Sequence, residues 1–445
     1  MIQQTTLGNG IRVVLEQIPH VQSVSVGIWF RTGAVDEASR DAGISHLIEH
    51  MMFKGTKTRS PKQLAEDADR IGASMNAFTG KEATCYYIKS LSSSVDKACG
   101  LLVDMLTESV FDPVELEKEK DVIYEEIKMV EDTPDDQISD LLDELVFQGH
   151  PYGNSVLGSR DALKAIDRER ILAYIRDQYT TDSMVISVSG RFDEARVLGI
   201  FETGLRGFQP AKTGRIHDPA AAPARHLVKV KDVEQAHFCM GVRSIPHDDP
   251  LHYPMQIMNS AFGGSMSSRL FQNIREQKGL AYSIYSASHH FVTAGVFEVF
   301  AGIGTDNLDR AIAAIHEEMQ ALRQDGLTAD ELAIAREQVK SGVVFSRENV
   351  NNRMFSNGKN LLLHGRIEEV EEILRRLDAV SLDDIRAAAG EYPQEVGDVH
   401  ARRLHDLVAD LDLGVRERPA VGECYPGTRR GKYHSQRLGF ERGSQ

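Results

Sequence analysis

The two halves of the chain repeat one order of strands and helices. The clearest correspondence lies between residues 111–116 (FDPVEL) and residues 327–332 (LTADEL), each of which follows one amphipathic helix and opens another. A chain of 445 residues is also too long for one ordinary hydrophobic core, so two domains of about 200 residues each are expected. The repeat therefore predicts two tandem domains of the same architecture.

Within each half, β-prone runs alternate with amphipathic helical segments. The first half opens with strands within residues 1–30, which include an Asn9-Gly10 turn typical of a hairpin, and closes with a strand at 184–190. The spacing of apolar residues predicts helices near 44–55 (with Ser45 as its cap), 61–71, 94–109 and 115–131. We predict an α+β fold of two tandem homologous domains, each a mostly antiparallel sheet covered by helices on one face.

The composition changes at two places along the chain. Residues 207–225 are rich in Gly, Pro and Ala, which is typical of a semi-extended linker. After residue 390 the chain becomes polar and rich in Arg and Gly, where the repeat would require an apolar closing strand. We therefore expect a first domain at 1–206, a linker at 207–225, a second domain at 226–390 and a disordered tail at 391–445.

The composition is that of an acidic globular protein. Hydrophobic residues make up 41% and charged residues 26% of the chain, and the formal net charge is −15. So large a negative charge argues against nucleic acids and anionic membranes as partners. No run of about 18 apolar residues and no signal peptide is visible, and the four cysteines form no C-x-x-C pair. These features predict a cytoplasmic protein without nucleic-acid or membrane partners.

One short motif in the first half indicates a chemical function. Residues 46–50 read His-Leu-Ile-Glu-His, so His46 and His50 stand four apart and share one face of a helix. Two neutral imidazoles suit zinc, and Glu49 beside them is placed to act as general base in a metal-assisted hydrolysis. This order, H-x-x-E-H, is the inverse of the commoner zinc-protease motif. The alternative is a pair of surface or capping histidines on an amphipathic helix.

A third metal ligand would decide between these alternatives. Glu119 and Glu126 stand two turns apart on one predicted helix and share a face, and Glu126 lies about 75 residues after His50. With this spacing the chain resembles the inverted-zincin peptidases of the pitrilysin/insulysin family over roughly residues 1–390. The likeness is greatest to the two-domain bacterial members that are similar to the mitochondrial processing peptidase β subunit.

The resemblance implies the composition of the metal centre. In such peptidases His46, His50 and Glu126 would bind one Zn²⁺ per chain, and Glu49 would activate the water. Glu119 matches a further glutamate of the family and would orient a ligand histidine, although a solvated helix carboxylate is an alternative for it. The second half offers no such ligands, because residues 249–253 contain no H-x-x-E-H.

The resemblance also implies residues that bind the substrate. Asn76, Ala77, Phe78 and Thr79 resemble the edge strand to which a substrate peptide adds as a further strand. An asparagine that satisfies a turn is the alternative for Asn76. In the second half, Arg275 and Tyr282 resemble an Arg–Tyr pair that binds the substrate carbonyl and steadies the oxyanion.

These observations together predict a zinc metalloendopeptidase that hydrolyses peptide bonds in peptides or unfolded segments. The alternative is a catalytically inactive scaffold or partner subunit of a processing-peptidase-like complex. Long family members carry four such domains and this chain carries two. The resemblance therefore implies a homodimer, with a heterodimer as the alternative, in which Arg275 and Tyr282 of one subunit face the zinc of the other.

Overall fold

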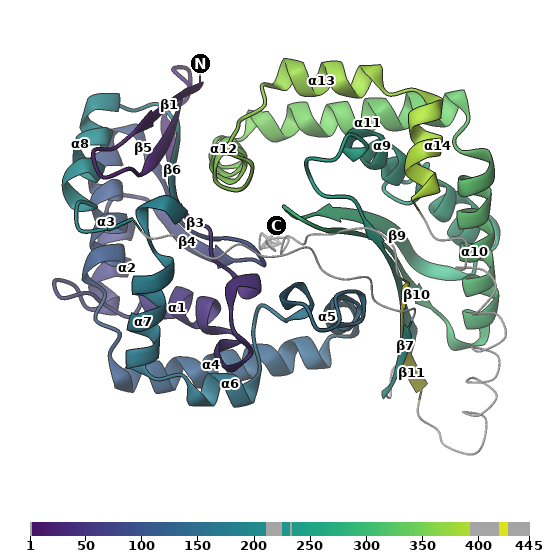
Figure 1. The fold of residues 1–445 in the computed structure, drawn as a ribbon, viewed down its shortest axis with the longest axis horizontal. Coiled ribbons are helices and arrows are strands. Elements are labelled where there is room, and N and C mark those ends of the chain that lie inside the picture. The colour runs from purple at the N-terminus through teal and green to yellow at the C-terminus, as the bar shows by residue number, and fades with distance from the viewer. Residues whose placement is uncertain (1, 211–224, 232–233, 392–417, 426–445) are drawn as a thin grey trace, which may run out of the picture.

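The protein consists of two halves that lie side by side, each built around one β-sheet (Figure 1). The structure is a computed structural model and describes residues 2–210, 225–231, 234–391 and 418–425. Along the chain, the strands of both sheets alternate with helices in the order that the repeat predicts. The predicted α+β fold of two tandem homologous domains is therefore confirmed.

The first sheet has the strand order β1-β2-β6-β3-β5-β4. Its strands are β1 (Ile2–Thr6), β2 (Arg12–Gln17), β3 (Ser23–Phe30), β4 (Ser74–Thr79), β5 (Thr84–Leu91) and β6 (Met184–Gly190). Neighbouring strands pair antiparallel, except that β2 and β6 run parallel. In β3 the residues after Ser23 are all buried, which shows that both faces of the sheet are covered.

The helices of the first half are named by their bounds: α1 (Ile44–Met52), α2 (Pro61–Arg70), α3 (Val95–Glu108), α4 (Pro113–Asp132), α5 (Pro134–Val146), α6 (Arg160–Ala165), α7 (Arg168–Gln178) and α8 (Glu194–Gly204). The four predicted helices correspond to α1 to α4 within a few residues. Apolar residues of α1, α3 and α8 pack in one core with β3, β5 and β6. Asp112 caps α4 by accepting from the backbone N–H of Val114 and Glu115, which fixes where this helix begins.

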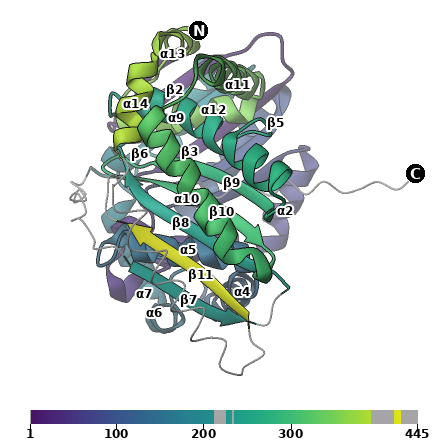
Figure 2. The same cartoon turned by 90° about the vertical axis from the view of Figure 1, so that its right-hand side faces the viewer.

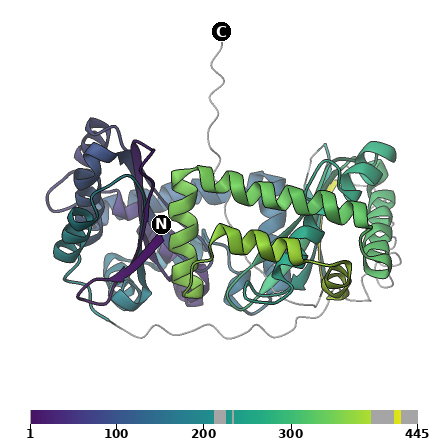
Figure 3. The same cartoon turned by 90° about the horizontal axis from the view of Figure 1, so that it is seen from above.

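The second sheet has the strand order β7-β11-β8-β10-β9 (Figure 2). Its strands are β7 (Arg225–Lys231), β8 (Ala236–Ser244), β9 (Ala281–His290), β10 (Gly295–Ile303) and β11 (Arg418–Tyr425). The helices of this half are α9 (His252–Phe262), the π-helix η6 (Leu270–Gln277), α10 (Leu308–Asp325), α11 (Ala329–Glu348), α12 (Val350–His364), α13 (Val370–Ala379) and α14 (Leu382–Gly390). Seen from above, α11 runs between the two halves (Figure 3).

Each half sends one helix onto the sheet of the other half, which the sequence did not predict. Helix α12 packs on β2, β3 and β6, and α5 packs on β8 and β11 (Figure 1). The prediction that helices cover one face of each sheet is therefore incomplete, because the second face is covered by a helix from the other half. A side chain at Gly358 of α12 would overlap the indole ring of Trp29, and a Cβ at Gly241 of β8 would lie 2.8 Å from Leu142 of α5. These glycines let the crossing helices approach the sheets closely.

The strand β11 corrects the expectation of a wholly disordered tail. It lies between β7 and β8, which is the place that β6 takes in the first sheet. However, β11 runs antiparallel to β7 and parallel to β8, whereas β6 runs parallel to β2 and antiparallel to β3. The position between β7 and β8 is therefore filled by a strand that runs opposite to the direction of β6 in the first sheet. Backbone N–H and C=O groups of β7 and β8 need partners there, and a strand of either direction can supply them.

Two predicted segments fall largely on residues that the structure does not describe. Most of the predicted linker, residues 211–224, lies outside the described residues, as do residues 392–417 and 426–445 of the predicted tail. Among the helices of the described residues, none has both the length and the apolar character that crossing a membrane requires.

Candidate metal centre and active site

Helix α1 carries the histidine pair, and its start is fixed by a buried carboxylate. Gly43 precedes the helix in the left-handed conformation, with φ of 93°. The Glu37 carboxylate accepts from the backbone N–H of Gly43 at 2.7 Å and of Ser45 at 2.8 Å. Burial raises the pKa of Glu37 to about 7, although these two donors oppose the shift. The predicted cap, Ser45, instead lies inside the helix, because Glu37 already satisfies the N–H groups of the first turn.

The three predicted metal ligands converge on one point. His46 and His50 lie one turn apart on α1, with ring centroids 4.6 Å apart, and Glu126 approaches them from α4. Oε2 of Glu126 lies 3.8 Å from Nε2 of His46 and 3.7 Å from Nε2 of His50. The ligand atoms of the three residues all lie within 4.8 Å of one another. Two imidazoles and one carboxylate at this spacing fit a zinc ion with one coordination position left for another ligand.

Glu119 contacts His50 at Nδ1, the ring nitrogen that does not face Glu126. Its Oε2 lies 3.1 Å from Nδ1 of His50, and its Oε1 lies 2.5 Å from Nζ of Lys54. The carboxylate is buried, so the histidine and the lysine are the groups that compensate its charge. When Nδ1–H of His50 donates to Glu119, the lone pair of Nε2 is directed to the Glu126 side. Sequence reasoning missed Lys54, which lies just beyond the end of α1 at Met52.

Glu49 lies beside the ligand cluster without belonging to it. Its Oε2 accepts a hydrogen bond from the hydroxyl of Thr79 in β4. Burial raises the pKa of Glu49 to about 7 and the Glu126 carboxylate adds to the shift, while Thr79 and His50 oppose it. A dication bound next to Glu126 would favour the ionised form of Glu49. The contact from Thr79 was not predicted, since β4 and α1 are distant in the sequence.

The predicted substrate-binding strand is β4, the edge strand of the first sheet. It pairs with β5 on one side, and within the described residues its other side has no partner strand. Asn76 is exposed, and its Oδ1 accepts from the backbone N–H of Ala77 at 2.8 Å. The ring centroid of Phe78 lies 5.4 Å from that of Trp29 and 5.7 Å from that of Phe355 in α12. The side chain of Phe78 therefore lies on the face of the sheet that α12 covers.

Arg275 and Tyr282 lie in the second half and make no hydrogen bond or ion pair with the ligand cluster among the described residues. Arg275 in η6 stacks over the Phe271 ring, with its guanidinium carbon 4.5 Å from the centroid, and lies 3.9 Å from Glu276. Tyr282, near the start of the edge strand β9, is 74% exposed. Within one chain, therefore, the structure brings together the three predicted metal ligands, Glu49, Glu119 and β4, but not this pair.

Comparison with known proteins agrees with this geometry. Residues 12–160 match the family model described as Insulinase (Peptidase family M16), and residues 165–339 match the model described as Peptidase M16 inactive domain. A Bacillus subtilis (strain 168) relative, named as the uncharacterized zinc protease YmxG, is 40% identical over 389 residues, which are 87% of this chain and 95% of the relative. The chain belongs to peptidase family M16.

Another relative and two solved structures extend the likeness. An uncharacterized zinc protease of Streptomyces coelicolor is 35% identical over 430 residues, covering 92% of this chain and 93% of the relative. A solved protease from Helicobacter pylori superposes with a TM-score of 0.79 at 17% identity, over 96% of this chain and 99% of that one. A Pseudomonas fluorescens structure described as a peptidase M16 inactive domain gives a TM-score of 0.81 at 16% identity, over 97% of this chain and 99% of that one.

Membership of family M16 confirms the predicted resemblance and makes this chain a member of a metallopeptidase family. The names of its relatives imply zinc, and the His46, His50 and Glu126 cluster has the donor set that zinc requires. The match of the second half to an inactive domain agrees with the repeat, since residues 249–253 lack the H-x-x-E-H motif of the first half.

Proposed function

We propose that this M16 protein is a zinc metalloendopeptidase that hydrolyses peptide bonds in peptides or unfolded segments, with Glu49 as the general base. The observation that carries the proposal is the cluster of His46, His50 and Glu126, whose ligand atoms lie within 4.8 Å of one another beside a carboxylate that is not a ligand. A structural zinc site has no need of such a carboxylate, whereas a hydrolytic site needs a base next to the metal.

The residues divide the reaction between them. When bound, zinc would supply Lewis acidity to the scissile carbonyl and to the attacking water. Glu49 takes a proton from this water as its oxygen forms a bond to the carbonyl carbon, and gives the proton to the leaving nitrogen as the C–N bond breaks. Thr79, which donates to Oε2 of Glu49, holds the carboxylate in place and leaves Oε1 for the water. Glu119 fixes the ring of His50 through Nδ1.

The position of β4 supports the binding of substrate as an added strand. The unpaired side of this edge strand offers backbone N–H and C=O groups to an extended peptide. Thr79 at its end touches Glu49, so a peptide bound along residues 76–79 would pass next to the general base. This arrangement favours extended or unfolded substrates over folded ones, because a folded protein rarely offers a free strand.

The proposal is tested with Glu49→Gln, which keeps the size of the side chain and removes the base. We expect zinc content to stay unchanged and peptide cleavage to fall by about 10²- to 10⁴-fold. Glu66→Gln, which changes an exposed glutamate on α2, is the control and should leave cleavage unchanged. Full cleavage by Glu49→Gln would overturn the proposed base. A wild-type chain that binds zinc without cleaving any peptide would favour the alternative of an inactive partner subunit.

We also propose that the active site is completed by Arg275 and Tyr282 of a second copy of the chain. The exposed phenol of Tyr282 and the absence of a contact between this pair and the ligand cluster among the described residues support this arrangement. An Arg and a phenol are suitable donors to the oxyanion that develops on the carbonyl. A heterodimer with a different chain is the alternative.

Subunit mixing tests this shared site. Homodimers of Glu49→Gln and of Tyr282→Phe should each have little activity. After exchange of subunits, half of the dimers would be mixed, and each of these would carry one intact site. We therefore expect recovery to about a quarter of wild-type activity. Activity that never exceeds the sum of the separate variants would contradict a site shared between two copies.

A further inference from the structure

A cluster of four histidines lies in the second half, away from the ligands on α1 and α4. His247 is in the turn after β8, His252 begins α9, His290 ends β9 and His364 ends α12. The rings of His247 and His364 stack nearly parallel with centroids 3.8 Å apart. His252 lies 4.5 Å from His247 and 4.8 Å from His290. Segments that are distant in the sequence thus place four imidazoles together.

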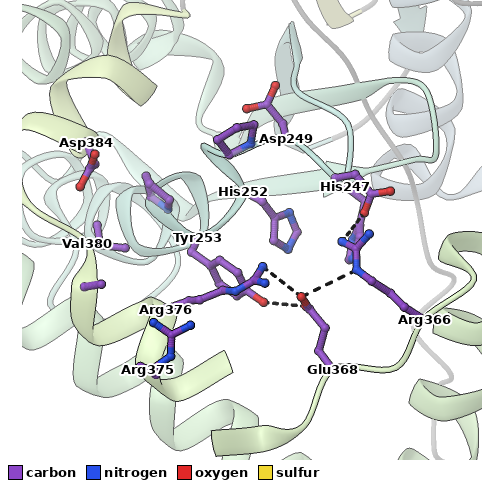
Figure 4. A pocket seen from close by; sticks show the side chains of 14 residues that line it. His247, Asp249, His252, Tyr253, Arg366, Glu368, Arg375, Arg376, Val380 and Asp384 are labelled. Atoms are coloured by element: carbon purple, nitrogen blue, oxygen red, sulfur yellow. Dashed lines mark hydrogen bonds and ion pairs between the residues drawn. The ribbon is translucent and has the colours of Figure 1, made fainter. Parts of the chain in front are cut away.

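The cluster borders a cavity of about 430 Å³ that is open to solvent (Figure 4). His247 and His252 line it together with Asp248, and Arg366 and Glu368 also border it, with Arg366 in contact with Asp248. The cavity provides a path by which a small ion can reach the histidines.

Three side chains of this region have the spacing of a metal site. His247, Asp248 and His364 each offer one ligand atom, and these atoms lie within 4.8 Å of one another, as in the cluster of the first half. The side chain of His364 is only 3% exposed, and its buried Nδ1 has no hydrogen-bond partner among the described residues. That atom lies 3.7 Å from Oδ1 of Asp248. A buried polar nitrogen without such a partner is costly, and a bound cation would satisfy it.

The other two histidines form hydrogen bonds, His290 through both ring nitrogens and His252 through one. His290 uses Nδ1 with the carbonyl oxygen of Ile245 at 2.9 Å and Nε2 with Oγ of Ser288 at 3.0 Å. Nε2 of His252 accepts from the side-chain amide of Gln256 at 2.8 Å. Nδ1 of His252 is buried without a hydrogen-bond partner among the described residues. Neither His252 nor His290 belongs to the group whose ligand atoms lie within 4.8 Å of one another, so His247 and His364 are the candidate ligands.

The end of α12 and the Asp248 carboxylate supply negative charge to this region, beside the cationic side chains of Lys359 and Arg366. His364 is the last residue of α12, and Gly365 follows it in the left-handed conformation, so the negative end of the helix dipole faces this region. The side chain of Asp248 is 45% exposed, and its Oδ1 accepts from Arg366 at 2.7 Å. Arg366 is half exposed and can turn to solvent when a cation takes its place.

We propose that His247, Asp248 and His364 form a second metal site, for a divalent transition-metal cation of the zinc class, in the half that lacks the H-x-x-E-H motif. Two imidazoles and a carboxylate are the ligands that such ions take. The site would fasten the turn after β8 to the end of α12. Because α12 lies on the first sheet, the cation would strengthen the connection between the two halves.

Cobalt binding to the metal-free full-length chain tests the second site, with metal content and the visible absorption of Co²⁺ as readouts. We expect two equivalents for the wild type and one for His46→Gln/His50→Gln. We also expect one equivalent for His247→Gln/His364→Gln. His290→Gln, from the same cluster but outside the ligand set, is the control and should keep two. A wild type with one equivalent, or two equivalents in His247→Gln/His364→Gln, would overturn the proposal.

A surface variant keeps the test informative if the buried histidine variants do not fold. Asp248→Asn, placed in the His46→Gln/His50→Gln chain, changes a half-exposed side chain and should weaken the remaining Co²⁺ binding at least tenfold. Zn²⁺ should raise the melting temperature of His46→Gln/His50→Gln, and Asp248→Asn should reduce this rise. Unchanged Co²⁺ affinity after Asp248→Asn would contradict the site. These readouts do not depend on peptidase activity, so they distinguish failure of this site from failure of the proposed function.

Discussion

Nδ1 of His50 lies 3.1 Å from Oε2 of Glu119, and the other oxygen of this buried carboxylate lies 2.5 Å from Lys54. The contact fixes which nitrogen of His50 is available to a metal. Since a free imidazole would have to be oriented at the moment of binding, Glu119 prepares the site in advance.

The first prediction concerns this contact. Glu119→Gln should lower the affinity for zinc about 10- to 100-fold, because the amide holds His50 less firmly and makes its ring a weaker donor. Competition with a zinc chelator measures the change. Glu115→Gln, which alters a partly exposed glutamate one turn earlier on α4, is the control. Equal zinc affinity of Glu119→Gln and the wild type would show that Glu119 does not orient His50 for the metal.

Thr79 gives a second prediction, on the general base. Thr79→Val removes the hydroxyl that donates to Glu49 and keeps the shape of the side chain. Cleavage should fall about 10- to 100-fold with zinc content unchanged, because a hydrogen bond to a charged group is lost. Thr79→Ser keeps the hydroxyl and should recover most of the activity. If the Thr79→Val and Thr79→Ser variants cleave peptides equally well, the Thr79 hydroxyl does not position Glu49.

How far the sequence determines these contacts differs from one residue to the next. His46, His50 and Glu49 are predictable because a helix places residues three and four apart on one face. The approach of Glu126 depends on the packing of α4 against α1, so only the family spacing indicated it. The contacts of Thr79 with Glu49 and of Lys54 with Glu119 join segments whose relative placement no local pattern encodes.

The arrangement of the two halves shows the same limit. The repeat predicts the order of strands and helices, because each half follows the same pattern of apolar residues. It does not predict that α12 crosses onto the first sheet or that α5 crosses onto the second, since an amphipathic helix does not specify which sheet it will cover. The reversed direction of β11 is likewise invisible in the sequence, because backbone pairing is open to either direction.

The crossing of α12 leads to a third prediction. Gly358→Ala places a Cβ against the ring of Trp29, which is buried and cannot move away. The variant should lose about 1–3 kcal/mol of stability through overpacking and melt at a lower temperature than the wild type. Gly100→Ala, in α3, meets no atom within 4 Å and should be neutral or slightly stabilising. Equal melting temperatures of Gly358→Ala and Gly100→Ala would contradict this packing.

Buried His316 of α10 gives a fourth prediction, on the effect of pH. Burial lowers the pKa of His316 to about 4 from its ordinary value of 6.5. In the unfolded chain His316 therefore binds a proton below about pH 6.5, whereas in the folded chain it stays neutral down to about pH 4. The contribution of neutral His316 to the free energy of unfolding is fully present above pH 6.5. It is lost as the pH falls from 6.5 to 4, by up to about 3 kcal/mol.

His316→Leu should remove that part of the dependence on pH. The melting temperature of the variant should fall less steeply than that of the wild type between pH 6.5 and 4. His20→Leu replaces an exposed histidine and should keep the wild-type slope. Parallel curves for the wild type and His316→Leu would show that His316 is protonated in the folded protein.

The ligand set itself is tested most directly by Glu126→Gln, with zinc content and peptide cleavage measured on the same preparation. The wild type, Glu125→Gln and Glu126→Gln are compared, since Glu125 is an exposed neighbour on α4 that pairs with Lys128. We expect Glu126→Gln to hold one equivalent of zinc less than the wild type and to lose cleavage, while Glu125→Gln keeps both. Full zinc content and full cleavage in Glu126→Gln would contradict the metal centre.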